Sequence, residues 1–371
     1  MMKFRAAASK DLIDTLAKPL LERIHRLGMS LSHEKGRKLI IMEVCGTHTV
    51  AYARSGITDL VSGYLDLRSG PGCPICVTHQ ADIDRIISLA GLEGTMVMTF
   101  GDMLRVPGSY TSLEKELARG RRIKICYSPL EAVDAAARSP ELKVVFIAIG
   151  FETTAPVIAA AIEMAEQMKL TNFWVYPVLK LVPPALRALL EVDNPPKLDG
   201  FLLPGHVATV LGSKAFEFVP NFGFPAVVAG FEHLDLLMGL YTILQLIREN
   251  KAVVGNAYSH VVRVEGNETA RLLMERFFTV EPTTLWRGLG EISASGYTLQ
   301  TNYGAFNARL HFKTEAAVAE TNPHCICGQV ITGRATPRQC RLFGRSCTPS
   351  TPVGPCMVSP EGVCGAHYHY L

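Results

Sequence analysis

The sequence has few charged residues and lacks the long runs that mark membrane or nucleic-acid binding. Charged residues make up 19% of the 371 residues, and the formal net charge is only +3. No run of five Lys or Arg residues occurs, so nothing indicates a nucleic-acid partner. No apolar run reaches the roughly 18 residues of a membrane helix, and the charged N-terminus has no apolar secretory core. We therefore expect a cytoplasmic protein without a membrane partner.

Several motifs of common enzymes are also missing. There is no GxxxxGK[ST] phosphate loop, no GxGxxG dinucleotide turn, no HExxH zinc helix and no GxSxG nucleophile elbow. The C-x3-C-x2-C spacing of radical SAM clusters is absent too. The cysteines are therefore the main candidates to carry chemistry.

The ten cysteines are unevenly distributed. Four lie in the first third of the chain, at Cys45, Cys73, Cys76 and Cys126, and none lies between Cys126 and Cys325. The other six crowd the C-terminal tail, at Cys325, Cys327, Cys340, Cys347, Cys356 and Cys364. In a reducing compartment such residues are better explained as metal ligands or reactive thiols than as structural disulfides. Two kinds of cysteine site are expected.

A recurring pattern predicts the fold class. Short apolar runs, each ending in a Gly-rich polar turn, alternate with segments of helical length such as 82–92 and 157–168; the runs are 39–44, 64–67, 96–100, 144–149, 201–203 and 226–229. Continuous Val- and Ile-rich runs of this length suit strands that are buried on both faces. Their alternation with helices predicts parallel α/β sheets.

Chemically active side chains follow nearly every predicted strand. Cys45 and His48 follow the first strand, Cys73 and Cys76 the second, and Asp102 the third, while Glu152 and His206 follow later ones. Because ligands of parallel sheets bind beyond the carboxyl ends of the strands, this asymmetry predicts one shared site. Asp102 and Thr153 could equally serve only as turn or cap residues.

Two cysteine motifs in the first third predict thiol chemistry. Cys73 and Cys76 form a C-x-x-C before a predicted helix, where the helix N-terminus should lower a thiol pKa. Such a pair can cycle to a disulfide or bind a soft metal. Cys45 and His48 could both bind iron, or the neutral imidazole could accept the thiol proton. Cys126 lies within an apolar run and is expected in the core.

The C-terminal cysteines predict a metal cluster in a tail too poor in apolar residues to form much core. Four of them, Cys327, Cys340, Cys347 and Cys364, are the expected ligands. Four thiolates can hold either a [4Fe–4S] cluster or zinc. The wide spacing lacks the paired C-x-x-C of most zinc ribbons and favours iron–sulfur. His367 and His369 are expected to be exposed tail residues.

Six short segments in this order resemble one known family. They are CGTH at 45–48, GPGCPIC at 70–76, FGD at 100–102, GFETT at 150–154, PGHV at 204–207 and WRGLG at 286–290. Together with the C-terminal cysteine framework, they resemble the HypD family of [NiFe] hydrogenase maturation factors, from about residue 10 to the end. Val50 stands where members commonly carry a second His.

The resemblance implies both a fold and a function. It implies two parallel-sheet α/β domains around a central cleft and a small C-terminal [4Fe–4S] domain, which we bound at 30–137, 138–250 and 251–371, with a helix over 10–29 packed on any of them. It implies that Cys45 binds the Fe(CN)2CO iron as transient cargo and that Cys73 and Cys76 form the redox pair. Asp102, Glu152 and His206 match polar positions that face the cleft.

The implied partners are a HypC-type small chaperone, whose cysteine shares the iron, and a HypE-type cyanide donor. The expected protein is a scaffold with redox activity rather than a conventional turnover enzyme. Two alternatives remain at this point: a cluster-dependent thiol–disulfide reductase without iron cargo, and a zinc-stabilised binding module.

Overall fold

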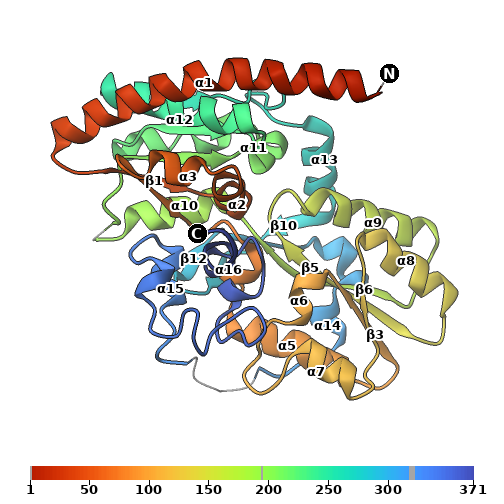
Figure 1. Ribbon diagram of the computed structural model, residues 1–371. Coiled ribbons are helices and arrows are strands. Elements are labelled where there is room, and N and C mark those ends of the chain that lie inside the picture. The colour runs from red at the N-terminus through yellow and green to blue at the C-terminus, as the bar shows by residue number, and fades with distance from the viewer. Residues whose placement is uncertain (1, 194, 317–321) are drawn as a thin grey trace. The chain divides into compact units, whose positions relative to one another are not determined.

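The computed structural model describes residues 2–193, 195–316 and 322–371, and it describes side chains from residue 16 onward (Figure 1). The chain forms two compact units, each built from separated stretches of sequence. Unit 1 comprises residues 1–72, 190–266 and 370–371, and unit 2 comprises residues 73–189 and 267–369.

Unit 1 is a parallel five-stranded sheet covered by helices. Its strands run in the order β2-β1-β7-β8-β9, and every neighbouring pair is parallel. The strands are β1 (Leu39–Glu43), β2 (Leu65–Ser69), β7 (Gly200–Pro204), β8 (Ala226–Ala229) and β9 (Val254–Asn256). The helices are α1 (Met2–Lys35), α2 (Gly46–Arg54), α3 (Ile57–Val61), α11 (Gly205–Leu211) and α12 (His233–Arg248).

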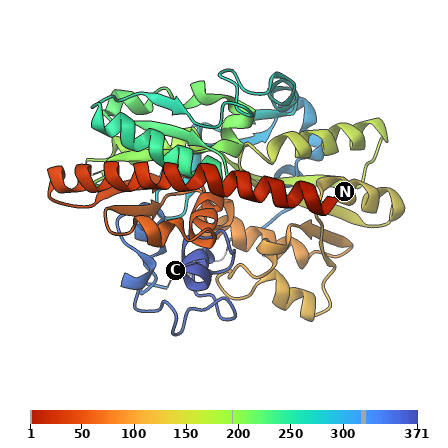
Figure 2. The same ribbon diagram turned by 45° about the horizontal axis from the view of Figure 1, so that its top comes forward.

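The core of unit 1 lies between the sheet and two long helices. Helix α1 lies beside α12 in both ribbon views (Figures 1 and 2). Ile24, Leu31, Leu240 and Ile243 pack in the same apolar cluster as Ile41 of β1. Burial of such side chains contributes roughly 1.5–3 kcal/mol each, which outweighs the weak helix preference of single residues.

Unit 2 contains a mixed sheet in the order β10-β13-β6-β5-β3-β4. Strands β3 (Thr95–Thr99), β4 (Ile123–Ile125), β5 (Lys143–Gly150) and β6 (Phe173–Lys180) are parallel. Strands β10 (Phe278–Val280) and β13 (Gly296–Leu299) add an antiparallel edge. Between them, β11 (Thr283–Trp286) and β12 (Gly290–Ser293) form a separate hairpin.

The helices of unit 2 begin where local sequence signals predict. Helix α8 starts with Pro129 after a capping box of Ser128 and Glu131, and α9 has a proline in its first turn. The main helices of this unit, α8 and α9 included, are α4 (Pro74–Val77), α5 (Gln80–Ala90), α6 (Gly101–Leu104), α7 (Leu113–Ala118), α8 (Pro129–Arg138), α9 (Ala155–Gln167), α10 (Val182–Glu191), α13 (Glu268–Phe277) and α14 (Ala308–His311).

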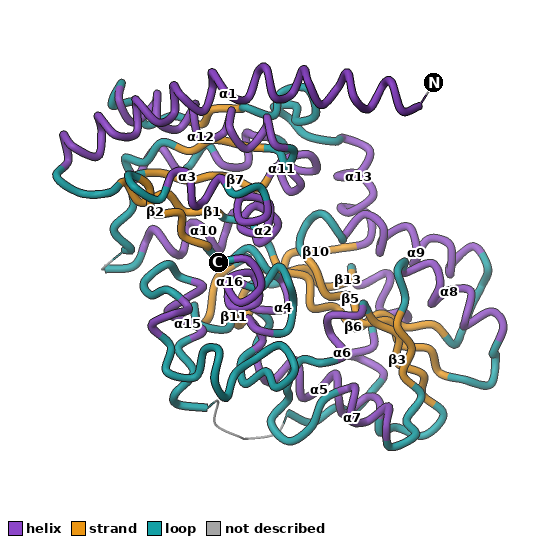
Figure 3. The backbone as a smooth tube through the Cα atoms, in the orientation of Figure 1, coloured by secondary structure: helices purple, strands orange, loops and turns teal. Residues whose placement is uncertain are grey.

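The C-terminal region is mostly loop. Figure 3 shows little regular structure between α14 and the end of the chain, apart from short helices. These are α15 (Cys327–Ile331), two 3-10 turns, η4 (Pro337–Gln339) and η5 (Pro355–Met357), and α16 (Val363–Tyr370). The expected Cys-rich tail of low regular structure is present.

The six predicted strands all form, and the α/β class is confirmed. The grouping of strands differs from the predicted boundaries of 30–137, 138–250 and 251–371. Strand β1 pairs with β7, through Ile41 and Gly200 for example, so the first sheet draws strands from both sides of residue 138. The prediction of parallel sheets also did not include the antiparallel strands β10 and β13. The expected central cleft stays a prediction.

Candidate functional site

Cys45 lies between the first strand of unit 1, which ends at Glu43, and a helix that begins at Gly46. It is the N-cap of α2, with extended backbone, and its side chain is 9% exposed. The loop from Gly70 packs tightly on it, because Gly46 N donates to Gly72 O at 3.2 Å. A Cβ on Gly72 would lie 2.4 Å from the Cys45 Cα, so only glycine fits there. Cys73 is the next residue along the chain.

His48 is buried one turn into α2. Its Nε2 lies 3.2 Å from Ala229 O and 3.0 Å from Gly230 O, and both of these atoms are acceptors. The proton is therefore assigned to Nε2, and Nδ1 faces no partner in the described chain. Burial lowers the His48 pKa to about 4, so the ring is neutral at neutral pH. The neutral ring can accept a hydrogen bond through Nδ1, and the expected transfer of the Cys45 thiol proton to this imidazole stays a prediction.

His48 and His206 are brought together through one phenyl ring. Phe231 stacks on His48 with ring centroids 4.5 Å apart and on His206 at 3.8 Å. His206 begins α11, and burial lowers its pKa as well. Both predicted histidines thus belong to one aromatic stack at the carboxyl ends of β1, β7 and β8.

A buried carboxyl beside this stretch was not predicted. Glu43, in β1, is 2% exposed, and burial raises its pKa to about 7. Thr49 Oγ1 donates to Glu43 Oε2 at 2.7 Å and lies 2.8 Å from Ser69 Oγ. Glu43 Oε1 has no partner in the described chain. The sequence signal that could have identified Glu43 is its position as a charged residue inside the apolar run 39–44.

The C-x-x-C pair opens unit 2. Cys73 is the N-cap of α4, and its Sγ accepts the backbone N–H of Cys76 at 3.3 Å. Cys76 is 1% exposed, and its pKa is raised, chiefly by burial and then by its hydrogen bond with Cys73. The expected lowering of a thiol pKa does not hold for Cys76, because desolvation exceeds what four residues of helix provide.

Two predicted polar residues in unit 2 have structural partners. Ser359 Oγ donates to Asp102 Oδ2 at 2.6 Å, which ties α6 to the C-terminal loop. Glu152 is 1% exposed and accepts the backbone N–H of Val182 at 2.8 Å, at the start of α10. Burial raises the Glu152 pKa to about 8. Glu152 Oε2 has no hydrogen-bond partner in the described chain, and the predicted place of Glu152 at a cleft stays a prediction.

All six C-terminal cysteines line one cavity. The structure joins Cys327 to Cys356 in a disulfide, which removes Cys327 from the available thiols. The remaining four are free: Cys325, Cys340, Cys347 and Cys364. Burial raises the pKa of Cys364, and the neighbouring Cys347, Cys325 and Cys340 raise it further. Convergent thiolates repel each other unless a cationic group neutralises them.

The four free thiols have the donor chemistry of a [4Fe–4S] cluster. In the described ranges, no three His, Cys, Asp or Glu side chains are arranged around one metal ion. Four thiols that line a cavity without meeting at one point suit a [4Fe–4S] cluster, because each binds a separate iron. Because of the disulfide, Cys325 and not Cys327 is among the four free thiols of this cavity, and the identity of the cluster ligands stays a prediction.

The C-x-x-C pair and the Cys-rich loop are packed together inside unit 2. A Cβ on Gly362 would lie 3.1 Å from Cys76 Sγ and 2.4 Å from Cys356 O. The WRGLG segment joins both: Arg287 donates to Thr78 O and Gln80 Oε1, each at 3.0 Å. Gly288 has a φ of +78°, and a Cβ there would lie 2.5 Å from Gly328 Cα. The expected burial of Cys126 is confirmed, at 1% exposure.

Comparisons with known proteins identify the family of this chain. The family model described as "HypD: Hydrogenase formation hypA family" matches residues 15–371. The chain belongs to the HypD family. The hydrogenase maturation factor HypD of Rhodobacter capsulatus is 41% identical over 374 residues, covering 100% of this chain and 98% of that protein. That of Escherichia coli is 40% identical over 353 residues, covering 95% and 94%.

HypD-family membership makes the chain a hydrogenase maturation factor. The HypD of Azotobacter vinelandii is also similar, with 42% identity over 340 residues and 90% of each chain covered. Within the described ranges, none of the helices combines the length and apolarity needed to cross a membrane. The motifs that carry the family resemblance are the ones whose geometry is described above.

Proposed function

We propose that this HypD-family chain is a redox scaffold on which the iron group of [NiFe] hydrogenases is assembled, together with HypC-type and HypE-type partners. One observation carries the proposal most directly: the C-x-x-C thiol Cys76 packs against the loop that supplies the free thiols of the Cys-rich cavity. A dithiol beside a set of cluster ligands is the arrangement that electron transfer to a bound substrate requires.

The cargo iron, carrying CN⁻ and CO, is assigned to the Cys45 thiolate. A low-valent iron is soft and prefers thiolate ligands. Cys45 stands at the N-terminus of the nine-residue helix α2, whose N–H groups stabilise a thiolate. His48, three residues after Cys45 in the same helix, is neutral at neutral pH, so it adds no charge beside the proposed iron ligand. A cysteine of the HypC-type partner supplies a second ligand.

Cys325, Cys340, Cys347 and Cys364 would hold the [4Fe–4S] cluster. When bound, such a cluster supplies single electrons. The chain's own contribution is the packing of Gly362 on Cys76, which leaves no space for a side chain between the two thiol regions. Cys73 and Cys76 then store two electrons and two protons as a dithiol and release both on forming a disulfide.

The deciding experiment compares Cys45→Ser with Cys126→Ser in protein copurified with its HypC-type partner. Infrared bands of iron-bound CO and CN⁻ should disappear in the first variant and persist in the control, whose cysteine is also buried. Visible absorbance of the cluster should persist in both. Retention of the infrared bands in Cys45→Ser would move the cargo site to Cys73 or Cys76.

A second candidate function is favoured by the Cys327–Cys356 disulfide. A chain with a cluster site, a disulfide and a C-x-x-C could be a thiol–disulfide reductase without iron cargo. This reading predicts that anaerobically purified complex shows no CO or CN⁻ bands and reduces a disulfide substrate catalytically. Detection of the bands excludes it.

A further inference from the structure

The positive charge of this chain is concentrated in its Cys-rich region. Residues 322–371 contain four arginines, one glutamate and neither lysine nor aspartate. Basic and acidic residues are equal in number in the rest of the chain, so this region accounts for the whole formal net charge of +3. All four of its arginines are exposed: Arg334, Arg338, Arg341 and Arg345. A surface of one sign on so small a region attracts partners of opposite charge.

Two of these arginines lie on a loop that forms one wall of the cysteine cavity. The loop spans residues 340–347, and Cys347 N donates to Leu342 O at 3.0 Å, which holds it in a tight turn. Four of its residues line the cavity, namely Cys340, Leu342, Phe343 and Cys347. Arg341 and Arg345 lie between them in the sequence and are exposed. The loop therefore contributes thiols and apolar groups to the cavity and guanidinium groups to the outer surface.

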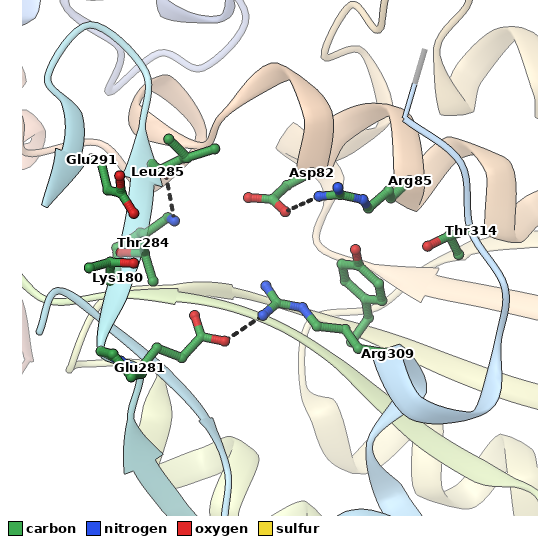
Figure 4. A pocket seen from close by; sticks show the side chains of 12 residues that line it. Asp82, Arg85, Lys180, Glu281, Thr284, Leu285, Glu291, Arg309 and Thr314 are labelled. Carbon is green, nitrogen blue, oxygen red and sulfur yellow. Dashed lines mark hydrogen bonds and ion pairs between the residues drawn. The ribbon is translucent and has the colours of Figure 1, made fainter. Parts of the chain in front are cut away.

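The charge of this loop is not matched by carboxylates. Within the described ranges, neither Arg341 nor Arg345 forms an ion pair. A second charged region of unit 2, the pocket in Figure 4, differs in this respect. Its lining holds three carboxylates and three cations: Asp82, Glu281, Glu291, Arg85, Lys180 and Arg309. The charges of that pocket balance one another, whereas the loop 340–347 presents a surface of one sign to solvent.

We propose that the loop 340–347 is the docking surface for a small acidic protein that carries single electrons on an iron–sulfur or flavin group. This inference rests on the proposed function, because the electrons enter the [4Fe–4S] cluster held in part by Cys340 and Cys347. Each docking event oxidises one carrier by one electron and reduces the cluster by one. Two such transfers, with two protons from solvent, convert a Cys73–Cys76 disulfide into two thiols.

The chemistry of the loop favours a protein carrier over other acidic partners. Redox encounters are among the smallest protein interfaces, so a loop of this size with exposed cations is sufficient. Opposite charge raises the rate at which such partners meet. A nucleic acid would also be attracted to arginine, but it has no electron to donate. The position of Arg341 and Arg345 on the outer side of a cavity wall therefore fits an electron carrier.

Docking is tested by calorimetry, which does not require a loaded cluster. The probe is an acidic plant-type [2Fe–2S] ferredoxin, titrated in its oxidised form into the full-length protein. At low ionic strength, Arg341→Gln/Arg345→Gln should raise the Kd at least about tenfold, and the difference should vanish near about 0.5 M salt. Arg122→Gln/Arg138→Gln removes the same charge from exposed positions outside the region and should bind like the parent. Equal Kd values for the two double variants, or tighter binding of a DNA duplex than of ferredoxin, overturn the proposal.

Electron delivery is tested on the anaerobically purified protein. Reduced ferredoxin should bleach the visible absorbance of the parent, and the Arg341→Gln/Arg345→Gln protein should react at least about tenfold more slowly at low ionic strength. Reduced methyl viologen, a small cation, should reduce both proteins at similar rates, because it needs no docking arginine. Slowing with both reductants would mean that the arginines act on the cluster itself, which overturns the proposal. A parent without cluster absorbance contradicts the proposed function instead, and the Kd comparison still decides the docking surface.

Discussion

At the residue scale, the buried carboxyl of Glu43 makes unit 1 sensitive to pH. Burial raises its pKa from 4.5 to about 7 in the folded chain, a difference that corresponds to about 3 kcal/mol. Because the folded state holds the proton more tightly, this stabilisation is present below about pH 4.5 and is lost as the pH rises through 7.

Glu43→Gln, which cannot ionise, should therefore remove the decrease in stability that accompanies ionisation of Glu43. As the pH rises from 5 to 8, the thermal unfolding midpoint of the variant, measured by circular dichroism, should increase relative to that of the parent. Glu141→Gln, at an exposed position, should follow the parent at every pH. A Glu43→Gln curve parallel to the parent would mean that Glu43 is already ionised in the folded chain.

The Cys-rich cavity allows a second residue-level prediction. Cys325→Ala should lose the visible absorbance of the cluster together with its iron and sulfide, because it removes one of four free thiols. Cys327→Ala should keep both, since it breaks only the disulfide with Cys356. Iron and sulfide analysis of the two variants, purified anaerobically, decides between Cys325 and Cys327 as the fourth ligand. Loss in Cys327→Ala alone would restore the original assignment.

At the scale of elements, the turn from β1 into α2 depends on a glycine in another loop. Gly72→Ala would place a methyl group 2.4 Å from Cys45 Cα and 2.5 Å from Val44 O. Such overpacking against backbone costs about 1–3 kcal/mol, and it should displace Cys45. We expect a lowered unfolding midpoint and weaker infrared bands of the cargo, with cluster absorbance retained.

Gly63→Ala is the matched control for this prediction. Gly63 has an ordinary backbone conformation, and a Cβ there meets nothing within 4 Å. It should leave stability and cargo unchanged. Equal behaviour of the two variants would show that the loop at Gly72 adapts without moving Cys45.

The elements also explain which parts of the fold were predictable. Six strands were found because their apolar runs are continuous, as in β5, where seven of eight residues are buried. Strand β6 was missed, because Pro177 lies inside it and proline argues against a strand interior. Strands β10 to β13 have only three or four residues each and alternate weakly. Their placement depends on tertiary pairing, which local sequence does not encode.

The candidate site was predictable in part for a similar reason. Cys45, His48, Cys73 and Cys76 follow recognisable strand ends, so their approximate setting was clear. Spacing could not show which of Cys325 and Cys327 is the cluster ligand. The two cysteines have a single residue between them, and only the folded loop determines where each thiol points. Glu43 belongs to no recognisable motif. Its pKa is raised by burial, which only the folded structure shows.

At the scale of the whole molecule, each unit depends on two distant stretches of chain. A fragment of residues 1–137 keeps β1 and β2 but loses β7, so one edge of β1 has no pairing partner. Residues 1–72 joined by a short linker to 190–266 keep all five strands of that sheet. We expect the linked fragment to be soluble and cooperatively folded, and the fragment 1–137 to aggregate.

Circular dichroism and size-exclusion chromatography of the two fragments test this division. The linked fragment should show a cooperative thermal transition. A folded, monomeric 1–137 fragment would instead support the boundary expected from sequence at residue 137.

The Cys327–Cys356 bond closes a ring of chain with a sequence separation of 29 residues, and Cys340 and Cys347 both lie inside that ring. Ring closure of this length removes about 3–4 kcal/mol of chain entropy from the unfolded tail in the loop-closure model. When the bond is reduced, that constraint disappears, and in a chain that holds the proposed cluster the thiolate–iron bonds would be the remaining covalent restraint on the same residues. If the disulfide forms before the cluster is inserted, the ligand cysteines can adopt fewer conformations. Cluster insertion should therefore be faster while the disulfide ring is closed.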